Sequence, residues 1–397
     1  MKIGFIGSGL NLLSGSSKPI FELMGALNKK NIETIMISDR LSSSIQDIQS
    51  DLENKNNLSS LQVERLSNNL LSKLARGDSD TIQKLSEFNR ELDLIVTTDF
   101  LMARLLRKNE IKFNCPLIFL ASNNLHLNIR DLINSGIMSF VNLSKIGFSS
   151  KLFIPKIILG RHLSEFDSII TTSNFVMKTF EEYHIKIAIE LLPIGVNIPD
   201  YSKNHIGKHD SRFSFYGWGS GIRGLQDVLH AFTKYREKGG TSELNVFLQG
   251  QHGFEERYYE NRIKNSEYSQ YINIEHFTRN IYESILSSMA VLLPFRVPFG
   301  YSHPPLTILE SMALGRVVIS TNVGCIPELI DNEIDGFTVN PKNPEKITDI
   351  LLNLQDEDLK RIGENALKRV QTNNSWDFVV KRYIDFFEEH AGGYFAN

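Results

Sequence analysis

Short apolar runs alternate with longer segments of helical apolar spacing along the first half of the chain. Such runs are typical of buried strands, and the segments between them are typical of amphipathic helices. We expect strands at Lys2–Ile6, Glu33–Ile37, Leu92–Thr97, Pro116–Leu120, Ser168–Thr172 and Glu190–Leu192. We expect helices at Lys18–Leu27, Leu101–Lys108 and Asn174–Tyr183. This alternation predicts a doubly wound parallel sheet.

The segment 41–90 interrupts the alternation. It is rich in Ser, Asn, Asp and Gln, and its leucines recur at helical spacing. These leucines are Leu52, Leu58, Leu61, Leu66, Leu70 and Leu74. We interpret the segment as two or three polar helices inserted into the first domain.

A second alternation begins after 193–212, a stretch rich in Pro, Gly and polar residues that we interpret as a linker. Strands are expected at Phe213–Tyr216, Leu244–Leu248, Ile272–Glu275, Val291–Leu293 and Val317–Ser320. Helices are expected at Pro344–Leu354, Asp358–Val370 and Trp376–His390. The sequence therefore predicts an α/β protein of two doubly wound, Rossmann-like domains, 1–195 and 196–375, whose strands end at a central cleft.

Length and composition narrow the class of protein. A chain of 397 residues is too long for one compact core. Its 41% apolar and 22% charged residues fit a soluble globular protein, and its net charge of −3 gives no global attraction to nucleic acid. The two cysteines, Cys115 and Cys325, fall in different predicted domains, which suits a reducing cytosol. Because the N-terminal apolar run is too short for a signal peptide and no run approaches a membrane span, we expect a cytoplasmic protein.

Two glycine-rich loops follow predicted strands. In the first loop, Gly7 and Gly9 are followed by Leu12, where a dinucleotide-binding fingerprint would have a third glycine. Glycines still let the backbone approach a ligand, and the helix that begins near Lys18 would present its N-terminus to an anion. The second loop, 215–224, again joins a strand to a helix.

The stretch 294–329 carries the most specific signal. A Gly/Pro loop leads into an apolar helix that contains one carboxylate, Glu310, and a β-branched strand and a second glycine turn follow. The run PPLTILESMALGRVVISTNVGCIPELI resembles the donor-sugar motif of retaining glycosyltransferases of family four (glycosyl transferases group 1), which have the GT-B fold. The resemblance is strong from about Arg212 to Asn340 and weak from Arg40 to Arg90. It implies that the last segment, 376–397, is a helix that crosses back to the first domain.

The resemblance implies a nucleotide-sugar donor site in the second domain. Glu310 would bind the ribose, because a carboxylate accepts hydrogen bonds from both hydroxyls of a diol. The family has another glutamate eight positions earlier, which falls on Ser302, so Ser302 or His303 would take over its contact with the sugar. Of the two cations that the family places on the diphosphate, Arg223 matches the second, and the first falls on the uncharged Trp218.

Backbone groups would complete the implied donor site. Pro304 and Pro305 have no N–H group, so Leu306 and Thr307 would donate to the phosphates from the first turn of the helix. The other donor-side positions are Gly217, Gly224, Gly250 and Arg279, of which Arg279 would face the base.

The resemblance places the acceptor in the first domain. The loop that ends near Ser14 and Gly15 would face the cleft. The family's fourth strand often ends in a histidine near the reacting centre; that position is Ser122, and His126 is the candidate replacement, although a lone histidine is more often structural. Catalysis would consist of positioning and of stabilising the departing diphosphate, without a protein nucleophile.

Neither a cofactor nor a metal is expected. No Cys, His or Asp grouping shows metal-ligand spacing, and the resemblance implies metal independence as well. The only small molecule required would be the nucleotide-diphosphate-sugar itself, as a substrate.

The segment 138–162 has two interpretations. Its lysines and its Arg161 alternate with Phe and Ile, which would suit peripheral contact with anionic lipid at the inner face of the membrane. The other interpretation, slightly favoured, is a helix that packs on the sheet and turns a basic face to solvent.

We predict a hexosyltransferase of polysaccharide or glycolipid biosynthesis that moves a sugar from a nucleotide-diphosphate donor to a hydroxyl of a glycan or lipid-linked acceptor. The alternative is a non-catalytic subunit that keeps the fold, binds nucleotide sugar and assists a partner transferase. Trp218, Ser302 and Ser122 favour this alternative, whereas Glu310 and Arg223 oppose it. A nucleotide-sugar epimerase would share the architecture but lacks the LESMALG pattern.

Overall fold

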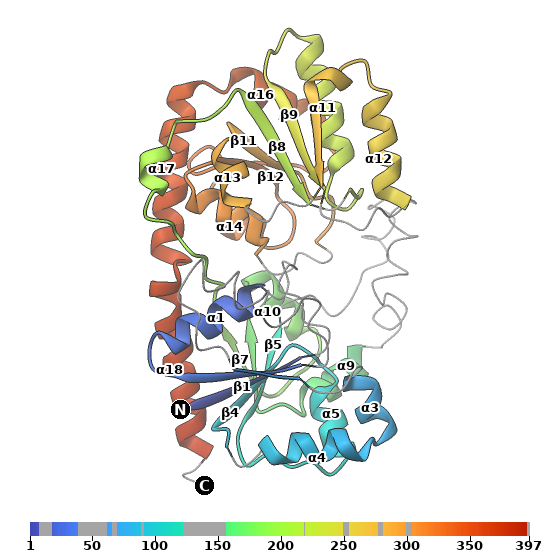
Figure 1. Ribbon diagram of the computed structural model, residues 1–397, viewed down its shortest axis with the longest axis vertical. Coiled ribbons are helices and arrows are strands. Elements are labelled where there is room, and N and C mark those ends of the chain that lie inside the picture. Colours follow the sequence, from blue (N-terminus) through green and yellow to red (C-terminus); the bar gives the residue numbers. More distant parts are fainter. Residues whose placement is uncertain are drawn as a thin grey trace. The chain divides into compact units, whose positions relative to one another are not determined.

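The computed structural model describes ten stretches of the chain, which form two compact units (Figure 1). The stretches are residues 1–7, 18–38, 62–65, 70–88, 91–121, 156–217, 219–248, 254–276, 281–298 and 304–394. The first unit contains the described residues up to 121, those of 156–195 and those from Trp376 onward, and the second contains the described residues of 196–375.

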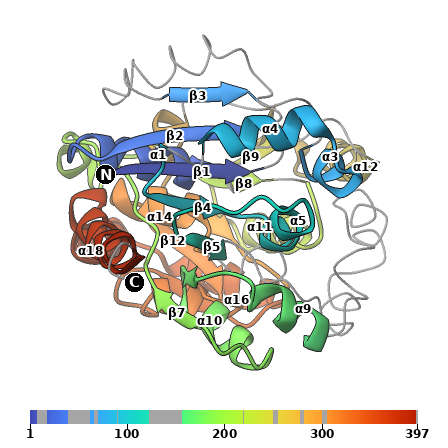
Figure 2. The same ribbon diagram turned by 90° about the horizontal axis from the view of Figure 1, so that it is seen from below.

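A seven-stranded parallel sheet forms the centre of the first unit. In spatial order its strands are β3 (Gln62–Arg65), β2 (Glu33–Ser38), β1 (Lys2–Gly7), β4 (Leu94–Thr97), β5 (Leu117–Ala121), β6 (Ser168–Thr171) and β7 (Ala188–Leu191). Figure 2 shows β3, β2, β1, β4 and β5 one after another. The strands β1, β2, β4, β5 and β6 are buried along nearly their whole length. This is the pattern of parallel strands that are covered on both faces, and it is the reason their sequences are continuously apolar.

Helices from both ends of the chain cover this sheet. They are α1 (Lys18–Asn28), α3 (Leu70–Arg76), α4 (Ser79–Phe88), α5 (Met102–Lys108), α9 (Lys156–Leu163), α10 (Asn174–Glu181) and α18 (Trp376–Tyr394). The last helix, α18, packs against α1 (Figure 1). The indole N–H of Trp376 donates to the buried carboxylate of Glu22 on α1 at 3.0 Å. Together with Val379 and Phe387, Trp376 joins the same core cluster as Phe5 of β1.

The strand β3 corrects the interpretation of 41–90 as helices throughout. The helices α3 and α4 lie in this segment, but Gln62–Arg65 pairs in parallel with β2, from Ile35 opposite Gln62 to Ser38 opposite Arg65. Four residues are too few to show a strand period, and the partner strand supplies the hydrogen bonds that decide the conformation. Of the regularly spaced leucines, Leu70 and Leu74 are fully buried, and the others lie outside the described residues.

The second unit is built around a six-stranded parallel sheet. In spatial order its strands are β10 (Ile272–His276), β9 (Glu243–Leu248), β8 (Arg212–Gly217), β11 (Ala290–Leu293), β12 (Val317–Thr321) and β13 (Phe337–Val339). The short edge strand β13 was not expected from the sequence. Its pairing with β12, from Ile319 opposite Phe337 to Thr321 opposite Val339, is again a long-range interaction.

One apolar core joins this sheet to the helices at 225–237, 254–264, 344–353 and 356–373. The helices of the second unit flank the sheet (Figure 1). They are α11 (Leu225–Glu237), α12 (Phe254–Lys264), α13 (Ile281–Leu286), α14 (Leu306–Ala313), α15 (Ile326–Leu329), α16 (Pro344–Asn353) and α17 (Asp356–Asn373), with short 3₁₀ turns η2 (Ser202–His205) and η3 (Ser269–Tyr271). Among the residues that the structure describes, no helix combines the length and the apolar character that a membrane crossing would need.

A close approach of two glycines joins α17 to the end of α14. A Cβ on Gly363 would lie 2.3 Å from the carbonyl oxygen of Gly315, and a Cβ on Gly315 would lie 2.7 Å from Ile206. Any side chain at Gly363 would therefore push α17 away from the helix that carries Glu310.

We predict that Gly363→Ala lowers the free energy of unfolding by about 1–2 kcal/mol. Overpacking costs about 1–3 kcal/mol, which outweighs the gain of about 0.5–1 kcal/mol for Gly→Ala in a helix. The matched control is Gly392→Ala in α18, where no heavy atom lies within 4 Å of the new Cβ. Urea unfolding should show the control unchanged or slightly more stable; a loss of equal size in both variants would contradict the packing argument.

Candidate functional site

The strand order of the second unit reverses between β8 and β11. The strands β9 and β10 lie beyond β8, whereas β12 and β13 lie beyond β11. In open α/β sheets, ligands bind outside the carboxyl ends of the strands at such a reversal. The loops that follow β8 and β11, together with the helices that begin there, therefore form the candidate site.

Gly217 ends β8 and makes room for Arg223. Its φ of 146° is a backbone conformation that favours glycine, and a Cβ on it would lie 3.3–3.4 Å from the side chain of Arg223. The N–H of Arg223 faces the carbonyl and hydroxyl oxygens of Ser220, at 3.2 and 3.4 Å. The guanidinium lies 5.5 Å from the ring centroid of the buried Phe295. Arg223 is thus a half-buried cation at the end of β8, between the two loops of the reversal.

Gly224 brings the start of α11 against the chain that leaves β11. It is the N-cap residue of α11, with φ of 75°, and a Cβ on it would lie 1.9 Å from the carbonyl oxygen of Pro294. Both the left-handed backbone and this contact require glycine. Arg223, one residue earlier, is placed by the same constraint.

A buried ion pair links the segment that follows β8 to the loop that follows β11. Asp227, in the first turn of α11, is only 3% exposed and accepts from two nitrogens of Arg296 at 2.6 and 2.5 Å. The backbone N–H of Arg296 donates to the carbonyl of Ile222 at 3.0 Å. The sequence analysis missed both residues of the pair, because a single charge on a predicted helix gives no sign of a partner far along the chain.

The start of α12 contacts the glycine-rich loop. The carboxylate of Glu255, which is buried, accepts from the N–H of Gly221 at 2.6 Å. A Cβ on Gly219 would lie 3.1 Å from the Cα of Glu256. The sequence analysis did not identify Glu255; its acidic position in the first turn of a helix was the available signal.

Tyr216 packs immediately before the glycine-rich loop. Its ring stacks on that of Phe247 in β9, with centroids 4.6 Å apart, and its hydroxyl lies 3.5 Å from that of Ser288. Burial raises the pKa of the Tyr216 phenol to about 12, so the group is protonated at neutral pH. The uncharged side chain of Tyr216 therefore packs against β9 and stabilises the end of β8.

The helix α14 presents its N-terminus after the β11 loop. Pro305 caps it, and the carbonyl of Pro305 faces the N–H groups of Ile308 and Leu309 at 2.9 and 3.4 Å. Within the described stretches no acceptor faces the N–H groups of Leu306 and Thr307. Glu310 follows Leu306 by one helical turn on the same face and is only 3% exposed.

The structure therefore brings Gly217, Arg223 and Gly224 together in one loop, and it places Leu306, Thr307 and Glu310 on one short helix. The other predicted site residues lie outside the described residues. They are Ser14, Gly15, Ser122, His126, Trp218, Gly250, Arg279, Ser302 and His303.

Comparisons with known proteins find a family match within the second unit. Residues 212–357 match the family described as Glycosyl transferases group 1. An uncharacterized glycosyltransferase of Methanocaldococcus jannaschii is 33% identical over 94 residues, which cover 23% of this chain and 24% of that protein. A probable sucrose-phosphate synthase of Thermosipho melanesiensis is 26% identical over 173 residues, which cover 42% of this chain and 38% of that protein. The chain thus spans between about a quarter and two fifths of the length of these relatives.

The fold extends over nearly the whole chain. The crystal structure of Anabaena Alr3699/HepE in complex with UDP and glucose superposes with a TM-score of 0.72, covers 98% of this chain and 99% of its own, and is 13% identical. At this identity the likeness shows the fold alone. The chain has the GT-B fold, with two Rossmann-like domains, and residues 212–357 of its second unit match the Glycosyl transferases group 1 family.

We predict that Asp227→Asn lowers the free energy of unfolding by about 3 kcal/mol, because it leaves Arg296 without its countercharge in a site that water hardly reaches. The matched control is Asp358→Asn, whose pair with Arg361 at 2.9 Å is exposed on α17. Exposed pairs contribute at most about 1 kcal/mol. If urea unfolding gave equal losses for the two variants, the pair would not hold the loops together.

Proposed function

We propose that the protein is a glycosyltransferase that moves a sugar from a nucleotide-diphosphate-sugar donor to a hydroxyl of a glycan or lipid-linked acceptor, with retention of the anomeric configuration. One observation carries the proposal. Arg223 is held as a half-buried cation at the reversal point of a glycosyl transferases group 1 domain, where such sheets bind ligands.

Arg223 and the start of α14 would bind the diphosphate. A guanidinium makes paired hydrogen bonds to phosphate oxygens, and its contact with Phe295 limits its exposure to water. The N–H groups of Leu306 and Thr307 would add donors at a helix N-terminus, where negative charge is favoured. These groups would act most strongly on the departing diphosphate, whose negative charge grows as the glycosidic bond breaks.

Glu310 would bind the ribose of the donor. Its carboxylate is buried on α14, and a carboxylate can accept from both hydroxyls of a ribose. The remaining donor contacts would come from Gly217, Gly224, Gly250, Arg279 and from Ser302 or His303. That HepE was crystallised with UDP and glucose supports a donor of this class.

The acceptor would bind to the first domain, near Ser14, Gly15, Ser122 and His126. Transfer would need no cofactor and no metal, because catalysis would consist of positioning and charge stabilisation.

We also propose a peripheral location at the inner face of the membrane. The described end of 138–162 supports it, since Ile157 is 64% exposed on α9, which also carries the exposed Arg161.

We predict that a panel of UDP-, GDP-, ADP- and dTDP-sugars will contain a donor that raises the thermal unfolding midpoint, and that Glu310→Gln abolishes the shift. A ligand that binds only the folded state stabilises it, and glutamine removes the charge while keeping the shape. The matched control, Glu364→Gln, changes an exposed glutamate of α17 and should keep the full shift. A folded chain that responds to no member of the panel would contradict the proposed donor site.

We predict that Arg223→Gln lowers the turnover of the donor by about 100-fold, as the loss of one oxyanion donor does in other enzymes. Arg223→Lys should restore part of the rate, because lysine keeps the charge but not the paired geometry. Release of the free nucleotide diphosphate from the donor is the measurement. Equal rates in the wild-type chain and in Arg223→Gln would remove Arg223 from the mechanism.

A further inference from the structure

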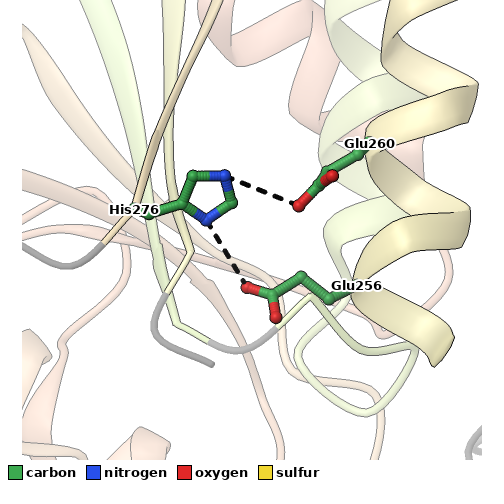
Figure 3. A group of neighbouring side chains, drawn as sticks. All are labelled: Glu256, Glu260 and His276. Atoms are coloured by element: carbon green, nitrogen blue, oxygen red, sulfur yellow. Dashed lines mark ion pairs between the residues drawn. The ribbon is translucent and has the colours of Figure 1, made fainter. Parts of the chain in front are cut away.

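Three ionisable side chains converge beside α12 (Figure 3). Glu256 and Glu260 lie one turn apart on α12, and His276 is the last residue of β10. The Nδ1 atom of His276 lies 4.0 Å from Oε1 of Glu256, and its Nε2 atom lies 3.5 Å from Oε1 of Glu260. One ligand atom from each residue can be chosen so that all three lie within 4.8 Å of one another.

Glu256 is the residue that indicates a ligand. It is 4% exposed, and its Oε1 atom receives no hydrogen bond from any residue that the structure describes. The ring of His276 is too far away to donate to it, because a hydrogen bond needs about 3 Å. This oxygen therefore has no hydrogen-bond donor among the described residues, and a buried acceptor without a donor is costly.

The composition of the group suits a cation. It contains two carboxylates, with side chains only 5% and 15% exposed, and one imidazole. A divalent ion would compensate both carboxylates at once. We propose that Glu256, Glu260 and His276 bind a divalent transition-metal ion of the Zn²⁺ type.

The donor atoms suit this class of ion. Two carboxylate oxygens and one imidazole nitrogen form a mixed set that Zn²⁺ accepts, whereas Mg²⁺ prefers oxygen ligands only. Ligand atoms at about 2.0–2.2 Å from a tetrahedral ion lie about 3.5 Å apart. The ligand atoms lie within 4.8 Å of one another, so binding would need a rearrangement of about 1 Å, to which the 42% exposed side chain of His276 can contribute.

The ion would support the glycine-rich loop. Glu255 directly precedes Glu256, and its carboxylate accepts a hydrogen bond from the N–H of Gly221. The Cα of Glu256 itself lies close to Gly219. A bound ion would link the start of α12 to the end of β10. It would thereby hold in place the part of α12 that contacts the glycine-rich loop. The sequence analysis missed the site because its ligands come from two elements and no short spacing joins them.

Isothermal titration of the full chain with ZnCl₂, after treatment with EDTA and desalting, tests the proposal without any donor. We expect one equivalent of Zn²⁺ to bind, and MgCl₂ to bind far more weakly. Glu256→Gln and His276→Gln should each weaken binding at least tenfold, since even the loss of a residue that only orients a ligand costs about 10–100-fold. His230→Gln, which changes an exposed histidine of α11, should bind as the wild-type chain does.

Circular dichroism establishes that each variant is folded before its titration is interpreted. Co²⁺ added in place of Zn²⁺ provides a second readout, because its visible bands report the coordination geometry and should vanish in His276→Gln. Failure of the wild-type chain to take up Zn²⁺, uptake that Glu256→Gln leaves unchanged, or Mg²⁺ binding as tight as that of Zn²⁺ would each overturn the proposal. All of these outcomes are independent of transferase activity.

Discussion

The contact between Gly224 and the carbonyl of Pro294 sets the geometry at the strand reversal of the second unit. Because a Cβ on Gly224 would lie 1.9 Å from that oxygen, α11 can begin directly beside the chain that leaves β11. One turn into α11, Asp227 then reaches Arg296 and closes a buried ion pair across the same two loops. Arg223 directly precedes Gly224, and its side chain lies beside Gly217 and Phe295, which limits its freedom at the end of β8.

The long buried strands could be predicted from the sequence. β1 and β12 are covered on both faces, so their sequences are continuous apolar runs bounded by turn residues, and their positions were predicted to within one residue at each end. The edge strands β3 and β13 were missed. Each is short and polar or half-buried, and each depends on hydrogen bonds to a neighbour that lies far away in the sequence.

Part of the candidate site could also be predicted from the sequence. Arg223 and Glu310 were predicted as site residues because a motif with fixed spacing carries them, and their role in the site stays a prediction. Glu255 and the pair of Asp227 with Arg296 carry no such spacing, since each acts through a partner on another element. A charge in the first turn of a helix looks like an ordinary solvated residue until the fold shows that it is buried against a loop.

We propose that the second unit binds a nucleotide-sugar donor at the strand reversal. Hydrogen exchange measured by mass spectrometry, with and without the tightest-binding nucleotide sugar, tests it most directly because it locates the ligand on the backbone. The account predicts slower exchange in peptides that cover 217–224 and 304–310, and Glu310→Gln should remove this protection. Protection confined to the first unit, in a chain that binds the donor, would contradict it.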